Sequence, residues 1–315
     1  MPHNLIFWVC FNLFVLVMMA LDLGVFQRKH HVVRFREAIG WTLVWMALAA
    51  LFALLLSRFG QQMAGDTTLP NGTLALQFIT GYVIEQSLSV DNLFVFLLLF
   101  RYFHVPGELQ RRVLTWGIVG ALLMRAAFIL AGVALIKRFE WVTYFFGAFL
   151  VYVGIKLFFA SGDETPKENF VIRVFRKMVP VTTEFDGGKF FTLKDGIRYA
   201  TPLAVVLLMV ETTDVLFAVD SIPAVLAISR DAFIVYTSNV FAILGLRSMY
   251  FALAGLMDVF HLLHYGLAIV LTFIGVKMLG AHFFEIPIGA SLGVVIGVLT
   301  TAVLLSLVFP KKHAA

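Results

Sequence analysis

Five carboxylates lie inside two long apolar segments of this chain, at Glu85, Asp91, Glu211, Asp214 and Asp220. The first segment reads "YVIEQSLSVDNLFVFLLLF" (82–100) and the second reads "MVETTDVLFAVDSIPAVL" (209–226). An ionised side chain at the centre of a bilayer costs at least about 2.5–3.5 kcal/mol on insertion scales. Five such charges without partners would rival the whole stability of an ordinary domain, about 5–15 kcal/mol. Protons, internal cations or a bound metal ion must therefore neutralise them.

The polar side chains beside these acids are further oxygen donors. Asn92 offers an amide, and Ser89, Thr213 and Ser221 offer hydroxyls, whereas neither segment holds a Cys or a His. Ligand sets made of oxygen alone suit Mn²⁺, Mg²⁺ or Ca²⁺ better than Zn²⁺ or Cu⁺. We interpret the acids as a cation path. A purely structural or proton-carrying network and an enzyme site are the alternatives.

The spacing of the acids predicts interrupted helices. Glu211 and Asp214 are three residues apart and share a helical face, but Glu85 and Asp91 are six apart and lie about 120° from each other on a straight helix. Glu85 and Asp91 can converge only if their helix breaks between them or if the two acidic segments face each other. We predict a break near Ser89 to Asn92, and a proline gives the second segment the same means to break.

The composition indicates a membrane protein. The chain of 315 residues is 61% hydrophobic and 14% charged, against about a quarter charged in an ordinary soluble domain, and its mean hydropathy is +0.93. Its single cysteine, Cys10, excludes an internal disulfide, and no CxxC or CxxCH motif supports redox-pair or haem chemistry. The net charge of +5 does not indicate nucleic acid, because most Lys and Arg lie between the apolar segments, where they set topology.

We predict an all-α transmembrane bundle with nine spans, taking about 20 apolar residues for each crossing. The spans lie at about 5–26, 36–57, 74–101, 113–136, 141–160, 199–228, 233–256, 260–280 and 286–309. Lys and Arg gather in the loops "QRKHHVVRFR" and "RYFHVPGELQRR", in the long connection after the fifth span and in the tail "KKHAA". This bias puts the N-terminus outside and the C-terminus in the cytoplasm. The start "MPHN" has no Lys or Arg, so we expect a first span rather than a cleaved signal peptide.

The two acidic segments belong to an internal repeat. "EQSLSVDNLFVF" aligns without gaps with "DVLFAVDSIPAV", which pairs Glu85 with Asp214, and downstream Arg125 matches Arg247. We expect both arginines to be internal counter-ions to the acids, while Asn239 could reach the site or cap a bend. A repeat of three spans reverses its own direction, so spans 3–5 and 6–8 form a candidate inverted repeat, as in alternating-access transporters.

The repeat divides the chain into peripheral spans (1–57), a first repeat (74–160), a cytoplasmic connection (161–198), a second repeat (199–280) and a last span with a basic tail (281–315). In the connection, "NFVIRVFRKMV" predicts a basic amphipathic helix suited to the headgroup layer. "TEFDGGKFFTL" predicts a hairpin that turns at Asp186-Gly187-Gly188. We interpret the connection as a structural linker on the membrane, with a regulatory domain as the alternative. Lys156 and Lys277, near span ends, are expected to reach the headgroups.

Three stretches, "GYVIEQSLSVDNLFVF", "YATPLAVVLLMVETTDVLFAVDSIPAV" and "TSNVFAILGLRSMYFALAG", resemble the TerC family of integral membrane proteins, and its Alx-type members in particular. The likeness extends over nearly the whole chain, without a departure from the acidic pattern. The family is linked by name to tellurium resistance and redox modulation, and the resemblance implies the efflux of manganese. By position, it marks as metal-binding residues Glu85, Asp91, Asn92, Glu211, Asp214, Asp220 and Ser221.

Together these observations predict a secondary transporter of the bacterial inner membrane that exports Mn²⁺, the metal and the outward direction being implied by the resemblance alone. We expect a divalent cation as substrate, protons and the lipid bilayer as partners, no prosthetic group, no enzymatic activity and no nucleic acid. One alternative is a membrane-bound redox or stress modulator that acts by binding partner proteins. A less favoured one is an intramembrane enzyme that resembles Mg²⁺-diphosphate prenyltransferases, whose acids would need basic residues at one membrane face.

Overall fold

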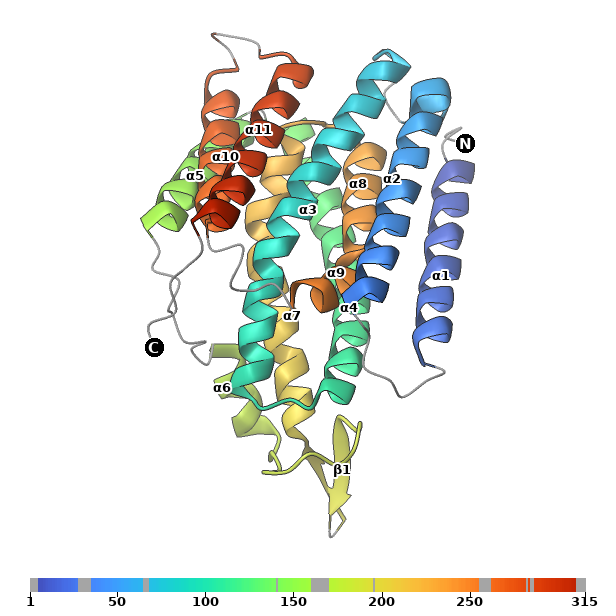
Figure 1. Ribbon diagram of the computed structural model, residues 1–315, viewed down its shortest axis with the longest axis vertical. Helices are drawn as coiled ribbons and strands as arrows, with labels where there is room; N and C mark the ends of the chain where they lie inside the picture. The colour runs from blue at the N-terminus through green and yellow to red at the C-terminus, as the bar shows by residue number, and fades with distance from the viewer. Residues whose placement is uncertain are drawn as a thin grey trace.

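A computed structural model describes residues 5–27, 35–64, 68–139, 141–159, 170–194, 196–254, 262–281, 283 and 286–309. In these ranges eleven helices and one two-stranded sheet are present (Figure 1). The helices are α1 (Leu5–Gln27), α2 (Phe35–Met63), α3 (Asn71–Tyr102), α4 (Gly107–Arg138), α5 (Trp141–Phe159), α6 (Phe170–Met178), α7 (Pro202–Leu226), α8 (Ala232–Leu244), α9 (Leu246–Leu253), α10 (Leu263–Leu279) and α11 (Ile288–Val308). The strands are β1 (Phe191–Lys194) and β2 (Ile197–Ala200).

Six of the described helices are long and apolar enough to cross a membrane, namely α2, α3, α4, α5, α7 and α11, and the bent pair α8 and α9 would make a seventh. The apolar stretch Leu5–Leu21 of α1 and helix α10 are shorter. The predicted helical membrane bundle is thus confirmed, while nine complete crossings and their orientation stay predictions. Large apolar side chains face outward on peripheral helices, for example Ile6 (71% exposed) and Leu54 (64% exposed), as expected of surfaces in contact with lipid.

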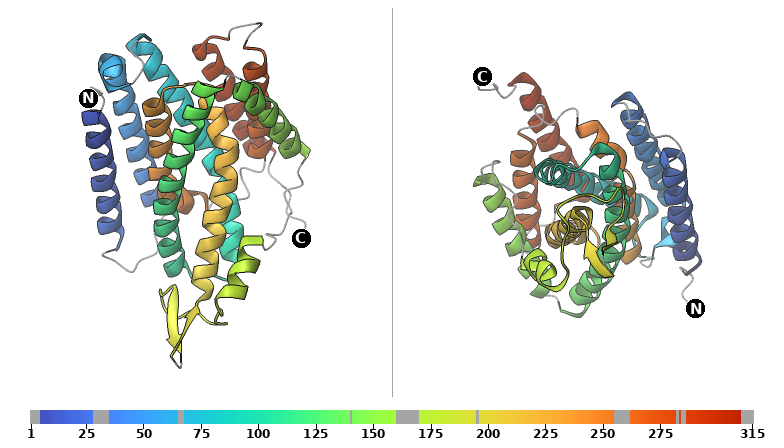
Figure 2. Two further views of the ribbon diagram at one scale, coloured as in Figure 1. Left: turned by 180° about the vertical axis from the view of Figure 1, so that it is seen from behind. Right: turned by 90° about the horizontal axis from the view of Figure 1, so that it is seen from below.

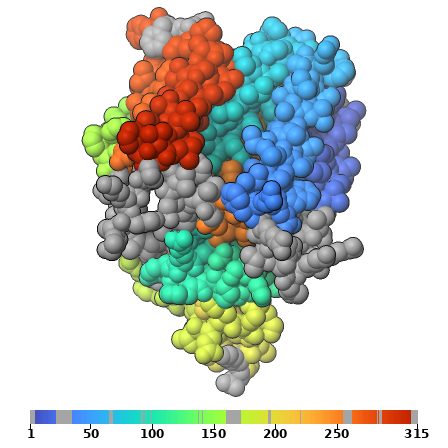
Figure 3. Space-filling model, in the orientation of Figure 1, coloured from blue at the N-terminus to red at the C-terminus, as the bar shows by residue number. Residues whose placement is uncertain are grey.

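The helices that carry the acids, α3 and α7, lie side by side and run in opposite directions (Figures 1 and 2). Near one end, Gly81 of α3 lies against Val225 of α7. At the other end, Tyr102 of α3 and Pro202 of α7 line the same pocket. On the face seen in Figure 3, α3 is visible between α11 and α2, both of which pack against it.

The helices that pack on α7 and α3 each run parallel to the helix they contact. α4 runs parallel to α7, because Gly117 lies against Val210 and Gly132 lies against Leu226. α8 runs beside α3 in the same direction (Figure 1). Thus α4 packs on α7 as α8 packs on α3, and α5 packs on α10.

α3 is a single helix, so the predicted break near Ser89 to Asn92 is wrong. The hydroxyl of Ser87 donates to the carbonyl of Val83 at 2.6 Å, within its own helix, instead of capping a freed end. The structure takes the other route that the spacing allows, in which acids converge from two helices that face each other.

α7 is also continuous, which corrects the second expected break. Pro223 lies in the last turn, where its missing donor removes a single helical hydrogen bond and the helix ends three residues later. The bend occurs instead in the next span: α8 and α9 meet at Gly245 with an angle of 42°. Arg247 follows this bend by two residues.

The connection after α5 forms a small lobe at one end of the bundle (Figure 1). A helix is present where the amphipathic helix was predicted, as α6, with Ile172 buried and Lys177 exposed, but Met178 at its end is 78% exposed. The hairpin lies further along the chain than predicted, because β1 and β2 are joined next to Gly196, whose φ of +76° suits glycine. The Asp186-Gly187-Gly188 stretch forms a separate turn, closed by a 3.0 Å hydrogen bond from the amide of Lys189 to the carbonyl of Asp186.

Helices α5 and α10 touch backbone to backbone. A Cβ placed on Gly275 of α10 would lie 2.7 Å from the carbonyl oxygen of Gly147 in α5, and one on Gly147 would lie 3.1 Å from that of Gly275. Two turns along α5, a Cβ on Gly154 would lie 2.8 Å from the carbonyl of Ala268. Small residues let membrane helices approach closely and gain packing energy that lipid does not otherwise provide.

We predict that Gly275→Ala separates α5 from α10 and destabilises the purified protein by about 1–3 kcal/mol, as overpacking does elsewhere. Gly297→Ala in α11 is the matched control, because nothing lies within 4 Å of its added Cβ. Alanine should there be neutral or stabilising by about 0.5–1 kcal/mol. Thermal unfolding in detergent measures both variants, and equal melting temperatures would contradict the backbone contact.

Candidate functional site

The charged centre of the bundle is Arg125 of α4, which lies between an acid of α3 and an acid of α7. Its Nη2 donates to Asp214 Oδ1 at 3.0 Å and its Nε donates to Oδ2 at 3.3 Å. Its Nη1 forms an ion pair with Glu85 Oε1. The exposed fraction is 1% for Arg125, 0% for Glu85 and 4% for Asp214. The expectation that Arg125 is an internal counter-ion is confirmed, and we call this group the arginine bridge.

The arginine bridge makes the burial of these acids tolerable. Two carboxylates and one guanidinium leave a net charge of −1, whereas the acids alone would carry −2. Arginine fits this place because its planar fork binds carboxylates through parallel hydrogen bonds. Removal of one member of a buried ion pair typically costs 3–5 kcal/mol, because the other charge stays buried without compensation. The arginine bridge therefore holds α3, α4 and α7 together at the level of these three charged side chains.

Glu211 lies one turn before Asp214 on α7, is half-buried and faces α4. A Cβ on Gly120 of α4 would overlap the carboxylate of Glu211, so a glycine is needed there to make room. Within the described residues no hydrogen bond or ion pair of Glu211 is present. The role of Gly120 was missed in the sequence, where the available signal was a glycine inside a long apolar helix, a position that costs helix stability without a close contact.

Several buried polar atoms on the surrounding helices lack a partner. Within the described part of the chain, Ser89 Oγ, Asn92 Nδ2 and Ser221 Oγ have no hydrogen bond, and neither do Asn239 Oδ1 and Nδ2. These side chains are at most 5% exposed and lie on α3, α7 and α8. An unsatisfied polar group in such surroundings costs about 1–3 kcal/mol. Asn92 and Ser221 were predicted ligands, and the structure adds Asn239 to the same group of unpaired donors and acceptors.

Arg247, which the sequence alignment pairs with Arg125, is also buried and is 3% exposed. Together with Asp214 and Phe96 it lines a cavity of about 20 Å³. This volume holds about one water molecule. Asp214 therefore faces Arg125 and also borders a small cavity with a second arginine.

The second acid of each motif, Asp91 in α3 and Asp220 in α7, has its side chain outside the described part of the structure. Among the side chains that are described, no three His, Cys, Asp or Glu residues form a group that could hold a metal ion. The complete predicted ligand set therefore stays a prediction. What the structure brings together is the first acid of each motif, through the arginine bridge.

The two lysines expected at the headgroups differ. Lys156 is exposed on α5. Lys277 is instead half-buried, and its Nζ donates to Ser291 Oγ at 2.7 Å. This bond ties α10 to α11, so the expected headgroup contact is corrected for Lys277.

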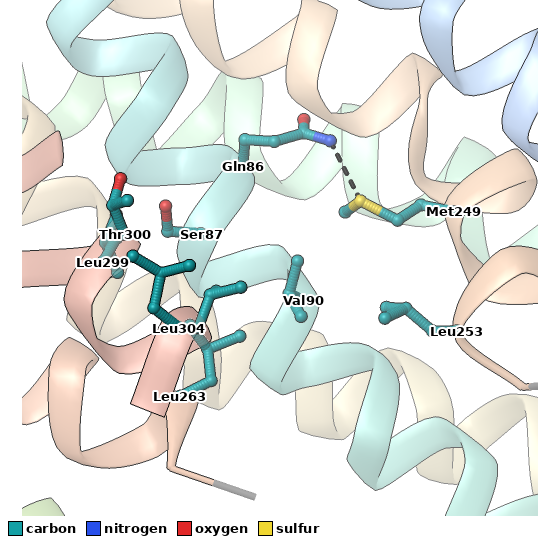
Figure 4. Close-up of a pocket in the computed structure, with 10 residues that line it drawn as sticks. Gln86, Ser87, Val90, Met249, Leu253, Leu263, Leu299, Thr300 and Leu304 are labelled. Carbon is teal, nitrogen blue, oxygen red and sulfur yellow. Dashed lines mark hydrogen bonds between the residues drawn. The ribbon is translucent and has the colours of Figure 1, made fainter. Parts of the chain in front are cut away.

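A larger pocket of about 450 Å³ opens between α3, α9, α10 and α11 (Figure 4). Apolar side chains such as Leu263 and Leu304 supply most of its wall. Gln86, directly after Glu85 on α3, reaches across it and donates from Nε2 to Met249 Sδ at 3.1 Å. Glu85 and Gln86 are adjacent on α3, so the apolar pocket and the buried charges are only one residue apart along this helix.

These features define a polytopic integral membrane protein whose apolar helices enclose a cluster of opposite charges. The chain belongs to the integral membrane protein TerC family, whose sequence profile it matches over residues 71–314. The match begins at the first residue of α3 and covers the helices that form the arginine bridge.

Relatives match over most of the chain. "Uncharacterized membrane protein STKORF319" of Myxococcus xanthus is 48% identical over 98% of this chain and 93% of its own. "Putative membrane-bound redox modulator Alx" of Salmonella typhi is 47% identical over 95% of this chain and 93% of its own. "Thylakoid membrane protein TERC, chloroplastic" of Arabidopsis thaliana is 51% identical over 74% of this chain and 61% of its own. No solved structure matches.

We predict that Arg125→Met destabilises the purified protein by about 3–5 kcal/mol, because it leaves two acids buried without their cation. The triple variant Glu85→Gln, Arg125→Met, Asp214→Asn removes all three charges and should recover most of the loss. Arg138→Met serves as the control, because Arg138 lies on the same helix and is exposed. Thermal unfolding in detergent is the measurement. A triple variant no more stable than Arg125→Met would show that charge compensation is not the reason for the loss.

Proposed function

We propose that this TerC-family protein is a secondary transporter that exports Mn²⁺ from the cytoplasm across the inner membrane, in exchange for protons. The observation that carries the proposal is the arginine bridge: carboxylates buried between helices of opposite direction, with a single cation between them. Ionisable groups inside a membrane bundle usually mark ion pathways. A structural role alone would be served at least as well by apolar residues of similar size.

The donor chemistry supports a hard divalent ion as the substrate. The acids Glu85 and Asp214 are accompanied by buried oxygen atoms of Ser89, Ser221 and Asn239 that have no hydrogen-bond partner among the described residues. Sets of carboxylate, hydroxyl and amide oxygens suit Mn²⁺, Mg²⁺ and Ca²⁺. The choice of manganese within this group comes from the family resemblance.

The packing supports the inverted repeat that the proposal needs. Exchange of α3 with α7, α4 with α8, and α5 with α10 converts the contact of α4 with α7 into that of α8 with α3, and the contact of α5 with α7 into that of α10 with α3. It leaves the contacting pairs α3 and α7, α4 and α8, and α5 and α10 unchanged. The two helices with acids run in opposite directions, as an inverted repeat requires. In transporters built this way the substrate site lies between the repeats, near the membrane midplane.

Export requires a coupled ion. Moving a divalent cation outward against an inside-negative potential requires about 4.6 kcal/mol per 100 mV. Carboxylates that lose a metal ion as they gain protons would provide this coupling, with protons entering as manganese leaves.

The second candidate is a membrane-bound redox modulator, which is what the printed name says of the Salmonella relative. Such a protein would act through partners, for which the lobe of α6, β1 and β2 is a projecting surface (Figure 1). The first experiment below separates the two functions. Loss of an intramembrane acid should raise the manganese content of the cell if the protein is an exporter, but not if it is a modulator.

We predict that cells carrying Asp91→Asn or Asp220→Asn accumulate more manganese after a manganese challenge than cells carrying the unmodified protein. The cause would be loss of one ligand and one proton-accepting group of the path. Total cell manganese, measured by mass spectrometry at matched expression, gives the answer. Glu184→Gln is the control, because Glu184 is an exposed acid in the connection. Equal manganese content in all strains would remove the exporter proposal.

In proteoliposomes, we predict that an imposed pH gradient drives ⁵⁴Mn²⁺ against its own concentration gradient. Manganese should move toward the more acidic side, because antiport carries protons the other way. Collapse of the gradient with a protonophore should abolish the accumulation. Manganese movement that is insensitive to the gradient would retain transport and refute proton antiport.

A further inference from the structure

We infer that Arg125 is the resident cation of the transport site. Its guanidinium occupies the place between Glu85 and Asp214 that the transported ion takes when it binds. Binding of the ion and release of Arg125 from the acids are then one exchange step. This inference rests on the proposed cation transport and adds to it a named residue that competes with the substrate.

The geometry of the arginine bridge is that of a bound cation. The guanidinium reaches one carboxylate with Nη1 and the other with Nη2 and Nε. Both acids are almost fully buried and come from helices of opposite direction. A divalent ion held by the first acid of each motif would bridge the same two helices through the same oxygens. Guanidinium and metal ion cannot both occupy this place.

The charges favour exchange over addition. With Arg125 in place, the two acids and the guanidinium sum to −1. A divalent ion added beside a bound guanidinium would bring this to +1 and place two cations side by side in a medium where like charges repel strongly. A divalent ion that replaces Arg125 at the acids leaves them neutralised, provided that the guanidinium finds another acid.

Glu211 is the acid positioned to receive it. Its carboxylate lies against Gly120 of α4, five residues before Arg125, which is about 7.5 Å along the helix axis. Side chains of an α-helix lean toward its N-terminus, so Arg125 leans toward the turn that Glu211 contacts. No described residue forms a hydrogen bond or an ion pair with Glu211, so its carboxylate is available.

Arginine differs from the acids in that it keeps its charge at every physiological pH. Its competition with the substrate therefore does not depend on proton binding, and its return to Glu85 and Asp214 would assist the release of the ion on either side. This has a measurable consequence. Removal of Arg125 should make the acids bind a divalent ion more tightly, and the thermal stability of the protein should then depend more strongly on that ion.

The test is the thermal unfolding of the purified full-length protein in detergent over a range of MnCl₂ concentrations. Arg125→Gln should melt below the unmodified protein without metal, and Mn²⁺ should raise its melting temperature by more. Half of the effect should be reached at a Mn²⁺ concentration lower by about tenfold, a difference of about 1.4 kcal/mol. The variant Arg125→Gln with Glu85→Gln and Asp214→Asn should lose this response, and Arg138→Gln is the control for removal of an exposed arginine from α4.

The outcomes separate the inference from the proposed function. If Mn²⁺ stabilises the unmodified protein and Arg125→Gln equally, Arg125 is a structural partner and the inference is overturned, while cation binding stands. If Mn²⁺ stabilises neither, the proposed site falls and the inference with it. Should Arg125→Gln fail to fold, Arg125→Lys replaces it. An ammonium lacks the fork that spans both acids, so half-maximal stabilisation should be reached at a lower Mn²⁺ concentration than in the unmodified protein, and an unchanged midpoint overturns the inference.

Discussion

The fold depends on one requirement, that the charge of Arg125 and those of Glu85 and Asp214 be matched where water is excluded. All three residues are at most 4% exposed, so bulk water cannot replace their partners. Each member comes from a different helix, so the ionic contact is complete only where α3, α4 and α7 meet. The surrounding apolar contacts are less specific, because lipid tails offer the same side chains contacts of nearly equal energy. The ionic contact has no such competitor and fixes which helices are neighbours.

The same contact joins α7 to α3 and α4. In the inverted repeat that we propose, α3 and α4 belong to the first unit and α7 to the second, so the arginine bridge would be an interaction between units. It is accompanied by polar atoms with no partner in the described residues, on Ser89, Asn92, Ser221 and Asn239. A structure optimised for stability alone would have paired or removed such atoms. Of these atoms, those on Ser89, Asn92 and Ser221 belong to α3 and α7, the helices that also carry Glu85 and Asp214.

Much of this could be read from the sequence, and the reasons for the failures are physical. Buried acids in an apolar chain demand a counter-ion, and the repeat offered Arg125 and Arg247 as candidates. The predicted break in α3 failed because it assumed that acids on one helix must converge, whereas Glu85 and Asp214 converge from two helices. The bend at Gly245 carried no such charge signal, and glycine is also common in straight membrane helices. The space that Gly120 provides for Glu211 depends on the distance between α4 and α7, which no pattern along the chain encodes.

The contact between α5 and α10 has a mechanical consequence. Between most helices a layer of side chains allows small sliding movements, which is how many domains shear against each other. At Gly147 and Gly275 this layer is missing, and carbonyl oxygens lie directly against the facing backbone. Sliding of α5 along α10 at this level would bring backbone atoms into overlap, so the contact holds the two helices at a fixed height relative to each other. In the inverted repeat that we propose, α5 and α10 belong to different units, and a rearrangement of one unit against the other would turn about this contact rather than slide past it.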